Sequence, residues 1–411
     1  MNLTADEQYI LAGKEGRATR KAMQILVALG TIYGAERMLP VSSVQVAGVS
    51  YDNLGEAGLQ WLDEMAAGGG RAQVLTTLNP AGMDVEKWQA LGISPDFAER
   101  QQRIIQAFAR MGIVTTCTCT PYLSGNLPHF GQHIAWAESS AVCYANSVLG
   151  ARTNREGGPS ALAAALTGCT PAYGYHLDEN RLPDLAVEVQ VQLTDTHHFG
   201  ALGKAVGEAL QAAGKKLPYI QGIEHTSLEN LKSLCASLAT FGGAAMFHMQ
   251  GITPEAGLFE PPAEKIVVTP ADLQAAIQSL NDATSEEVDF VSLGCPHLSI
   301  QEIARIAQLL EGKKVSKEFW ITTARPTKQI ADLMGYTQII ETSGARIAAD
   351  TCCVVAPIRG RFRAMATDSA KACYYAYSKN RFKTVFKPFD EVVATALITN
   401  KTNEANRTNK I

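Results

Sequence analysis

Hydrophobic positions along the chain follow a repeated order of strand, loop and helix. Apolar residues recur at the spacing of one helix face over residues 5–29, 55–67, 96–111, 135–149 and 199–213. Short apolar runs typical of buried strands occupy residues 43–50, 74–79, 112–115, 185–193, 216–220, 244–248, 288–293, 319–323 and 347–355. Strands that alternate with helices predict an α/β fold, in which loops gather at the C-terminal ends of the strands.

The chain of 411 residues is long enough for more than one lobe. We predict one α/β lobe in residues 1–200 and further α/β lobes in residues 201–399. The boundary falls within residues 184–217. Residues 400–411 are polar and are expected to form a frayed tail.

Composition and charge exclude several classes of protein. Hydrophobic residues make up 46% of the chain and charged residues 18%, which is typical of a folded globular protein. The formal charge of -4 gives no overall attraction to nucleic acid or to anionic lipid. The first 20 residues lack the apolar core of a signal peptide, and no apolar run reaches the roughly 18 residues of a membrane span. We therefore expect a cytoplasmic enzyme that binds neither membranes nor nucleic acid.

Three cysteine-bearing segments carry the most specific chemical signal. Cys119, Cys295 and Cys352 each lie where a predicted strand gives way to a loop. Nine cysteines in a chain without a secretion signal favour metal binding, catalysis or burial over a disulfide framework. Three thiolates can hold an iron–sulfur cluster and leave one iron open as a Lewis acid, which is the chemistry of a hydro-lyase. The alternative is that the three residues are buried small hydrophobes, as most free cysteines are.

The other cysteines fit a cluster less well. In an extended strand Cys117 would face the same side as Cys119, so that either thiol could be a ligand. Cys353 adjoins Cys352 and raises the same question. The remaining cysteines lie on predicted helices or without companions, and they are expected in the core: Cys143, Cys169, Cys235 and Cys373.

A polar loop after the predicted helix 135–149 is the candidate anion site. Arg152 and Arg155 could each bind a carboxylate or phosphate through two hydrogen bonds, and the glycines that follow allow backbone N–H groups to approach an oxyanion. The alternative is a solvated loop whose arginines pair with Glu138, Glu156 or Asp178. Loops after other strands add further donors. The candidate substrate-binding residues are Gly48, Ser50, Asn79, Asn146, Arg152, Asn154, Arg155, Ser160 and His248.

Two histidines are candidates for acid–base chemistry. His248 lies at a predicted strand end, and His176 precedes Asp178 and Glu179. A histidine in an apolar setting is more often a hydrogen-bonded core residue, and that alternative stays open for both. The sequence alone assigns no catalytic base.

Several separated motifs form a specific combination. They are residues 32–37, 47–51, 76–79, 116–122, 137–141, 145–155, 176–181, 294–297 and 350–352, and they include Gly294-Cys295-Pro296-His297. In this combination the chain resembles the catalytic, large chain of the aconitase X family within the aconitase superfamily. The resemblance extends over roughly residues 3–398.

The resemblance implies a dehydratase with the multi-lobed α/β fold of the aconitase superfamily. Its iron–sulfur cluster would be ligated by Cys119, Cys295 and Cys352, as 4Fe–4S when intact and as 2Fe–2S or mononuclear iron after loss of iron. In this family a small swivelling domain completes the active site, and this chain lacks one, so a small partner subunit is implied. In the wider superfamily the catalytic base is a serine of that domain.

Two branches of the family differ in substrate. Residues 77–84 and 155–165 are similar to the archaeal branch, which dehydrates (R)-5-phosphomevalonate to trans-anhydromevalonate 5-phosphate in a variant mevalonate pathway of isoprenoid biosynthesis. The bacterial branch dehydrates cis-3-hydroxy-L-proline. We expect the phosphorylated substrate, because a doubly charged group accounts for two arginines and a glycine-rich turn. Cys353 departs from the family pattern, which has a non-ligating apolar residue there, so it leaves the third ligand open.

Two other classes of protein would use the same residues differently. A mononuclear metal lyase would hold a single iron with the three thiolates and contain no sulfide. An iron-sensing, RNA-binding protein would need a basic face with interspersed aromatic residues, which the net charge of -4 disfavours.

Overall fold

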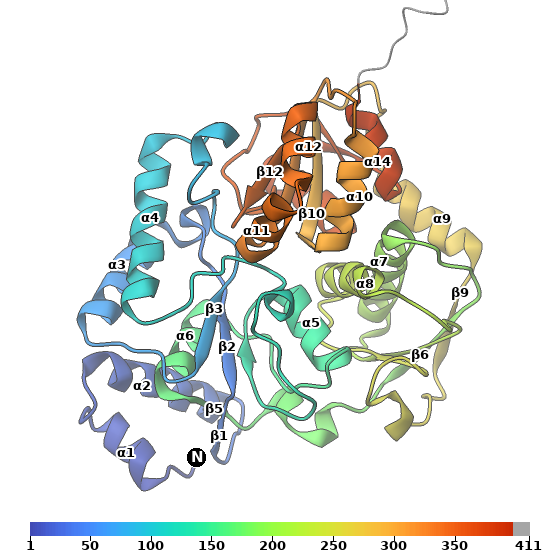
Figure 1. Ribbon diagram of the computed structural model, residues 1–411. Helices are drawn as coiled ribbons and strands as arrows, with labels where there is room; N and C mark the ends of the chain where they lie inside the picture. The colour runs from blue at the N-terminus through green and yellow to red at the C-terminus, as the bar shows by residue number, and fades with distance from the viewer. Residues whose placement is uncertain (398–411) are drawn as a thin grey trace, which may run out of the picture.

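Four β-sheets organise residues 1–397, the part of the chain that the computed structural model describes (Figure 1). The helices are α1 (Ala5–Leu11), α2 (Arg17–Ile32), α3 (Tyr51–Ala67), α4 (Pro95–Arg110), α5 (Ser139–Ser147), α6 (Gly158–Thr167), α7 (Thr196–Ala213), α8 (Leu228–Phe241), α9 (Pro270–Ser279), α10 (Ile300–Leu310), α11 (Arg325–Leu333), α12 (Tyr336–Ser343), α13 (Ala370–Tyr375) and α14 (Phe389–Ala396). The strands are β1 (Met38–Pro40), β2 (Ser43–Val46), β3 (Leu75–Leu78), β4 (Ala135–Trp136), β5 (Cys169–Pro171), β6 (Leu185–Val189), β7 (Pro218–Gln221), β8 (His248–Met249), β9 (Lys265–Val268), β10 (Phe290–Leu298), β11 (Glu318–Thr323), β12 (Arg346–Ala349), β13 (Ala364–Thr367) and β14 (Lys383–Phe386).

The first lobe is built on the parallel sheet β3-β2-β4. Every residue of β2 is buried, as expected of a strand covered on both faces. Helix α2 packs against α6, α3 packs against α4, and β1 pairs with β5 in a separate antiparallel ribbon. The whole lobe is blue to green in Figure 1.

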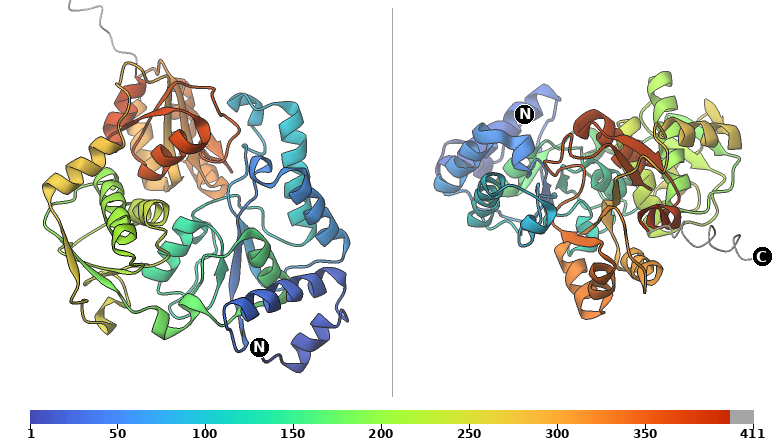
Figure 2. Two further views of the ribbon diagram at one scale, coloured as in Figure 1. Left: turned by 180° about the vertical axis from the view of Figure 1, so that it is seen from behind. Right: turned by 90° about the horizontal axis from the view of Figure 1, so that it is seen from above.

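The second and third lobes each contain a larger parallel sheet. The second lobe has the strand order β8-β7-β6-β9, with α7 packed against α8 and α9. The third lobe, orange to red in Figure 1, has the order β12-β11-β10-β13-β14, with α10 packed against α11, α12 and α14. The two further views in Figure 2 show the first and second lobes on either side and the third lobe against both.

Helix α5 joins the first lobe to the second. It packs against α8, and its residues Val142 and Tyr144 share one hydrophobic cluster with Leu234 and Leu238 of α8. In Figure 1 it lies in the middle of the molecule, between the three lobes. Side chains at its first turn can therefore reach loops from every lobe.

The prediction of parallel α/β sheets is confirmed, and the N-terminal helix differs from its prediction. Residues 5–29 form two helices rather than one. Gly13 and Gly16, which lie between α1 and α2, have φ angles of 83° and 101°, and these conformations end a right-handed helix.

Two segments near the centre also differ from prediction. Residues 135–149 begin as strand β4, which pairs with β2, and become helical only where the Glu138 side chain caps α5. Residues 112–115 contribute one isolated bridge, between Val114 and Thr77, instead of a strand. In both places tertiary pairing overrides the apolar pattern along the chain.

Within residues 1–397, no helix combines the length and the apolar character that crossing a bilayer requires. The polar tail predicted at residues 400–411 lies outside the described part of the chain.

Candidate functional site

The three cysteine-bearing segments meet at one buried place. Cys295 lies in β10, Cys352 follows β12, and Cys119 lies in the loop after the bridge at Val114. The Cys295 thiol donates a hydrogen bond to the sulfur of Cys352, and Cys119 is close enough to Cys352 to interact with it electrostatically. The exposed fractions of Cys119, Cys295 and Cys352 are 7%, 9% and 5%. The fold thus gathers thiols from distant parts of the sequence into one cluster.

Cys295 is presented by an irregularity in β10. The parallel register between β10 and β11 shifts between Leu293 and Leu298, so the residues between them leave the regular ladder. Gly294 has a φ of 113°, and a Cβ atom there would lie 2.2 Å from the carbonyl oxygen of Thr322. Glycine is therefore required immediately before the cysteine.

Backbone N–H groups point at two of the three sulfurs. The N–H of His297 donates to Cys119 Sγ at 3.2 Å. The N–H groups of Val354 and Val355 donate to the sulfur of Cys352. Hydrogen bonds of this kind favour the thiolate over the thiol, and they tune the properties of clusters that thiolates hold.

The three thiols differ in their tendency to ionise. The hydrogen bond from Cys295 lowers the pKa of Cys352 to about 7, although burial opposes this shift. The same hydrogen bond, together with burial, raises the pKa of Cys295 well above its usual range. Burial, with Glu138 and Cys352 nearby, raises the pKa of Cys119 to about 12. Cys352 is accordingly the thiol that ionises first.

His297 connects all three cysteine-bearing segments. It follows Cys295 by two residues, its Nδ1 lies 3.0 Å from the Thr118 hydroxyl oxygen, and its Nε2 lies 2.9 Å from the Thr351 carbonyl oxygen. Burial lowers the pKa of His297 to about 4, so the ring is neutral. Because a carbonyl only accepts, Nε2 carries the proton and Nδ1 accepts from Thr118.

A buried ion pair lies beside the thiols. Lys371 Nζ of α13 is 2.6 Å from Glu138 Oε1, and the side chains of both residues are at most 10% exposed. The other carboxylate oxygen of Glu138 accepts from the Ser140 hydroxyl at 2.5 Å and from the Ala141 N–H at 2.7 Å. Burial opposes the charged form of Glu138, yet Lys371, Ser140 and Ala141 together lower its pKa. The carboxylate is fully engaged and stays charged.

An arginine ties the loop after β3 to the turn before Cys352. Arg325, the first residue of α11, pairs with Asp84 at 3.0 Å and also with Asp350. Asp84 in turn accepts from the N–H of Ala349 at 2.9 Å. Asp350 adopts a φ of 67°, which reverses the chain between β12 and Cys352. These contacts hold the cysteine loop against the first lobe.

The donor set fits an iron–sulfur cluster. Thiolates are the ligands that such clusters take, and three of them converge here with N–H groups already directed at the sulfurs. The nearest imidazole, that of His297, has both ring nitrogens occupied, and Glu138 is saturated by its own partners. The site therefore offers sulfur and no free nitrogen or oxygen ligand from these two side chains.

Cys117 and Cys353 have other surroundings. Cys117 has a φ of 45°, so the chain is not extended there, and the expectation that it shares a side with Cys119 does not hold. It packs in the core of the first lobe, where Ala81 donates to its sulfur. Cys353 is hydrogen-bonded to the side chain of Ser292. The cysteines expected in the core are buried: Cys143, Cys169, Cys235 and Cys373.

Three predicted substrate-binding residues lie at the edge of the first sheet near the Cys352 loop. The Ser50 hydroxyl donates to the carbonyl of Val355 at 3.0 Å. Asn79 follows β3, and its buried Oδ1 has no hydrogen-bond partner among residues 1–397. Gly48 follows the neighbouring strand β2 and has a φ of 78°. A free acceptor at this edge is suited to a hydroxyl or an N–H of a bound molecule.

Arg152 lies at the opposite end of that sheet. It bridges to His133, which precedes β4, whereas Gly48 follows β2, and β2 and β4 are parallel. Its guanidinium is 2.5 Å from Asp178 and donates to the His176 carbonyl at 3.3 Å. The structure therefore does not bring Arg152 to the cysteines. Its ion pair with Asp178 is one of those expected if the loop does not bind an anion.

Four other predicted substrate-binding residues have partners within the protein. All four are buried, and their hydrogen bonds fix loops of the first and second lobes. These are Asn146 with Thr153 and Ala245, Asn154 with Tyr173 and Tyr175, Ser160 with Glu156 and Gly157, and His248 with Arg181. His176 likewise contacts His133, with 3.0 Å between the two Nδ1 atoms.

Arg155 has a different setting from Arg152. Its side chain is exposed and has no ion pair or hydrogen bond with the described residues. It precedes Gly158, whose added Cβ would lie 2.7 Å from the Ala47 carbonyl, so this loop touches the end of β2. Arg155 is thus on the same edge of the sheet as Gly48 and is available to an anion.

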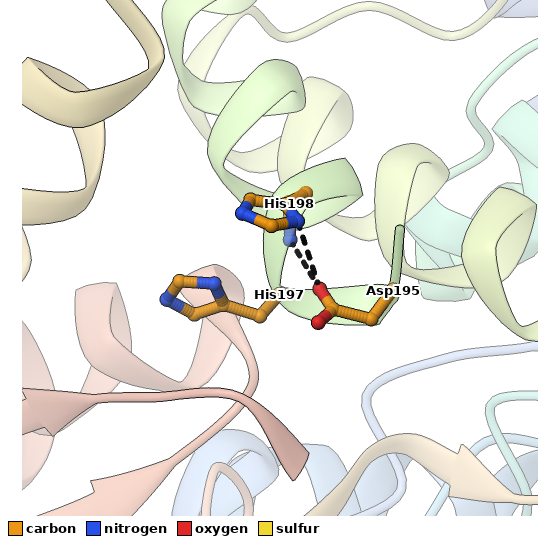
Figure 3. A group of neighbouring side chains, drawn as sticks. All are labelled: Asp195, His197 and His198. Carbon is orange, nitrogen blue, oxygen red and sulfur yellow. Dashed lines mark hydrogen bonds and ion pairs between the residues drawn. The ribbon is translucent and has the colours of Figure 1, made fainter. Parts of the chain in front are cut away.

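A second group of metal-ligating side-chain types lies at the start of α7. Asp195, His197 and His198 have ligand atoms within 4.8 Å of one another (Figure 3). Asp195 caps the helix by accepting from the His198 N–H at 3.0 Å, and the His197 ring points away from that pair and stacks on Phe386. These contacts are those of a helix cap.

Family models match the chain in three consecutive pieces. They are the aconitase X first domain over residues 1–179, the second domain over residues 183–278 and the third domain over residues 288–398. The chain belongs to the aconitase X family. The resemblance seen in the sequence motifs is confirmed.

Relatives of known name lie in two groups. The phosphomevalonate dehydratase large subunit of Methanocaldococcus jannaschii is 45% identical over 404 residues, which cover 96% of this chain and 99% of that protein. The cis-3-hydroxy-L-proline dehydratase of Hypocrea jecorina is 34% identical, and the match covers 91% of this chain and 65% of that protein. The crystal structure of Thermococcus kodakaraensis aconitase X in its holo-form matches with a TM-score of 0.90 and 44% identity, over 96% of this chain and 100% of that chain.

Sequence reasoning missed the charged and imidazole groups around the thiols. Lys371 and Glu138 lie 233 positions apart and carry no sign in the sequence that they are paired. His297 stands in the motif with Cys295, but only the fold shows that it reaches Thr118 and Thr351. A histidine two residues after a candidate ligand was the one available signal.

Proposed function

We propose that this chain is the large subunit of a phosphomevalonate dehydratase, a hydro-lyase that dehydrates (R)-5-phosphomevalonate to trans-anhydromevalonate 5-phosphate. The convergence of Cys119, Cys295 and Cys352 is the observation that carries the proposal. The name and the 45% identity of the archaeal relative support the choice of substrate. The proposed cofactor is an iron–sulfur cluster held by these three thiolates, in the 4Fe–4S form when intact.

The reaction removes the hydroxyl group from C3 and a proton from C2, so that a C2=C3 double bond forms and water leaves. When bound, the cluster supplies an open iron that acts as a Lewis acid toward the departing hydroxyl. This chain holds the ligating sulfurs in a buried site, where His297 keeps the three segments in place and Gly294 allows β10 to bulge. Burial also limits the access of bulk water to the reacting carbon atoms.

Anion recognition is proposed at the edge of the first sheet. Arg155 is exposed and has no partner among the described residues, and Gly48 lies on the same edge. A guanidinium and backbone N–H groups are suited to a phosphate. Asn79, whose Oδ1 lacks a partner, is the proposed acceptor for a substrate hydroxyl. Arg152 is a weaker candidate, because Asp178 already neutralises it.

The proposed partner is a small subunit with a swivelling domain. The relatives that support the function are named large subunits. His297, which lies beside the thiols, and His248, which lies in β8, are both buried and hydrogen-bonded within residues 1–397. We therefore propose that the base that removes the C2 proton comes from the small subunit.

The decisive experiment is anaerobic co-expression with a candidate small subunit, followed by assays of 5-phosphomevalonate and cis-3-hydroxy-L-proline. We expect turnover of the phosphorylated substrate alone; turnover of hydroxyproline alone would overturn the substrate assignment. Iron and acid-labile sulfide are measured in the same preparation, because a mononuclear site contains no sulfide.

A matched pair of variants tests the ligand role. Cys295→Ala should lose cluster absorbance and activity together. Cys169→Ala serves as the control, since Cys169 is also buried but lies in β5, away from the cluster. Retained activity in a cluster-free Cys295→Ala protein would end the proposal.

A further inference from the structure

Lys371 is a buried cation whose hydrogen-bonding capacity is largely unused. Its ammonium group has three N–H donors, and Glu138 Oε1 at 2.6 Å accepts from one of them. Glu138 gives its other oxygen to Ser140 and Ala141. A buried ammonium normally has acceptors for its remaining donors. Among residues 1–397, Glu138 is thus the one hydrogen-bond partner of the ammonium group, and further N–H donors are left for a group bound beside it.

The position of α13 supports that expectation. Ser369, which caps α13, lines the same small cavity as Cys295. Lys371 follows two residues later and interacts electrostatically with the thiols of Cys119 and Cys295. Glu138, which caps α5, fixes the ammonium group through the ion pair. Lys371 thus interacts with one carboxylate and with two candidate ligands.

We propose that Lys371 supplies the countercharge and N–H donors for the thiolate ligands of the bound cluster, and that Glu138 orients it. This inference rests on the proposed function, because it requires a cluster at the three cysteines. Three thiolates bring three negative charges into a buried site, where an unpaired charge is strongly disfavoured. A fixed ammonium nearby stabilises the more negative, reduced state of the cluster and strengthens ligand binding.

The test is the midpoint potential of the reconstituted cluster, measured anaerobically in the complex with the small subunit. Lys371→Met removes a positive charge and should lower the potential. Glu138→Gln removes a negative charge, leaves Lys371 in place, and should raise it. Lys371→Arg keeps the charge and should stay nearest the wild type. A merely structural role would not produce shifts of opposite sign.

Iron retention gives a second measurement. In competition with a chelator, Lys371→Met should bind iron about 10- to 100-fold less tightly than the wild type, as expected when a group that supports metal ligands is removed. Lys204→Met is the control, because Lys204 is similarly buried and pairs with Glu208 at 2.5 Å, on α7. That variant should keep the wild-type potential and iron content.

The outcomes separate this inference from the proposed function. A wild-type protein that contains no iron and no sulfide would contradict both the inference and the proposed function. A wild-type cluster whose potential is unchanged in Lys371→Met and Glu138→Gln, or moves in the same direction in both, would overturn the inference alone. If Lys371→Met does not fold, the inference is still tested by the other two variants: the midpoint potential should rise in Glu138→Gln and stay near the wild-type value in Lys371→Arg.

Discussion

Replacing His297 by alanine should separate the positioning of the three thiols from the overall stability of the protein. The substitution strands the buried Thr351 carbonyl, which accepts from His297 at 2.9 Å, and removes one of the partners of the Thr118 hydroxyl, which keeps its contact with the Thr120 hydroxyl at 3.1 Å. The stranded carbonyl costs about 1–3 kcal/mol, and the cavity left by the imidazole adds to that cost. We expect the free energy of unfolding of the cluster-free protein to fall by about 3–5 kcal/mol. Denaturant unfolding under anaerobic conditions measures this fall.

The same substitution should impair cluster loading, because the loops of Cys119 and Cys352 lose the side chain that joins them. We expect iron and sulfide per chain to fall well below the wild-type values after reconstitution, with affinity reduced about 10- to 100-fold. His176→Ala is the matched control, since His176 is also buried and hydrogen-bonded through one nitrogen, but to His133. It should lose stability and keep its iron. Full loading of His297→Ala would refute the positioning role.

Two further substitutions test charged groups near the site. Arg325→Met leaves Asp84 and Asp350 buried without their cation, so the free energy of unfolding should fall by about 3–5 kcal/mol. The control is Arg305→Met, which breaks an exposed ion pair with Asp390 and should lower the free energy of unfolding by less than about 1 kcal/mol. Equal losses in the two variants would contradict the argument. Burial, reinforced by Glu302, raises the pKa of Asp368 to about 6, above the roughly 3.9 of an unfolded aspartate. The folded protein therefore binds the extra proton between about pH 4 and 6, and stability falls by about 3 kcal/mol as the pH rises through that window. Asp368→Asn should be more stable than the wild type above pH 6 and no more stable below pH 4, as measured by thermal unfolding; a pH-independent difference would contradict this.

The order of strands and helices, and the loops that carry the cysteines, could be predicted from local pattern. Strands β10, β11 and β12 are apolar runs, and Cys352 follows β12 as predicted. Cys295 differs from its prediction, because β10 continues to Leu298 and the cysteine lies within it, where the register with β11 shifts. Parallel strands bring such ends to one edge of a sheet, which is why thiols distant in sequence were expected to meet. The first-lobe contribution of Cys119 followed from the family motif.

The partners of these groups could not be predicted, because pairing across lobes leaves no trace in the local sequence. The strand β4 is two residues long and is defined by its pairing with β2, not by its own pattern. In an extended chain the side chains of Cys117 and Cys119 would face the same side, so either could be a ligand. Cys117 has a φ of 45°, so the chain is not extended there and the two thiols have different surroundings. Dihedral angles of this kind depend on the packing around the residue.

The loop that contains Arg152 and Arg155 shows that a residue's position along the sheet determines which groups its side chain can bind. Arg152 and Arg155 are three residues apart, and sequence reasoning treated them as one anion-binding pair. Because residues 152–156 run alongside β4, they carry the chain from one end of the first sheet to the other, with Arg152 beside His133 and Glu156 bonded to Trp136. An extended chain advances about 3.3 Å per residue, so three residues separate the two arginines by about 10 Å. One guanidinium therefore meets Asp178 at the far end, and the other is left free at the edge where β2 ends.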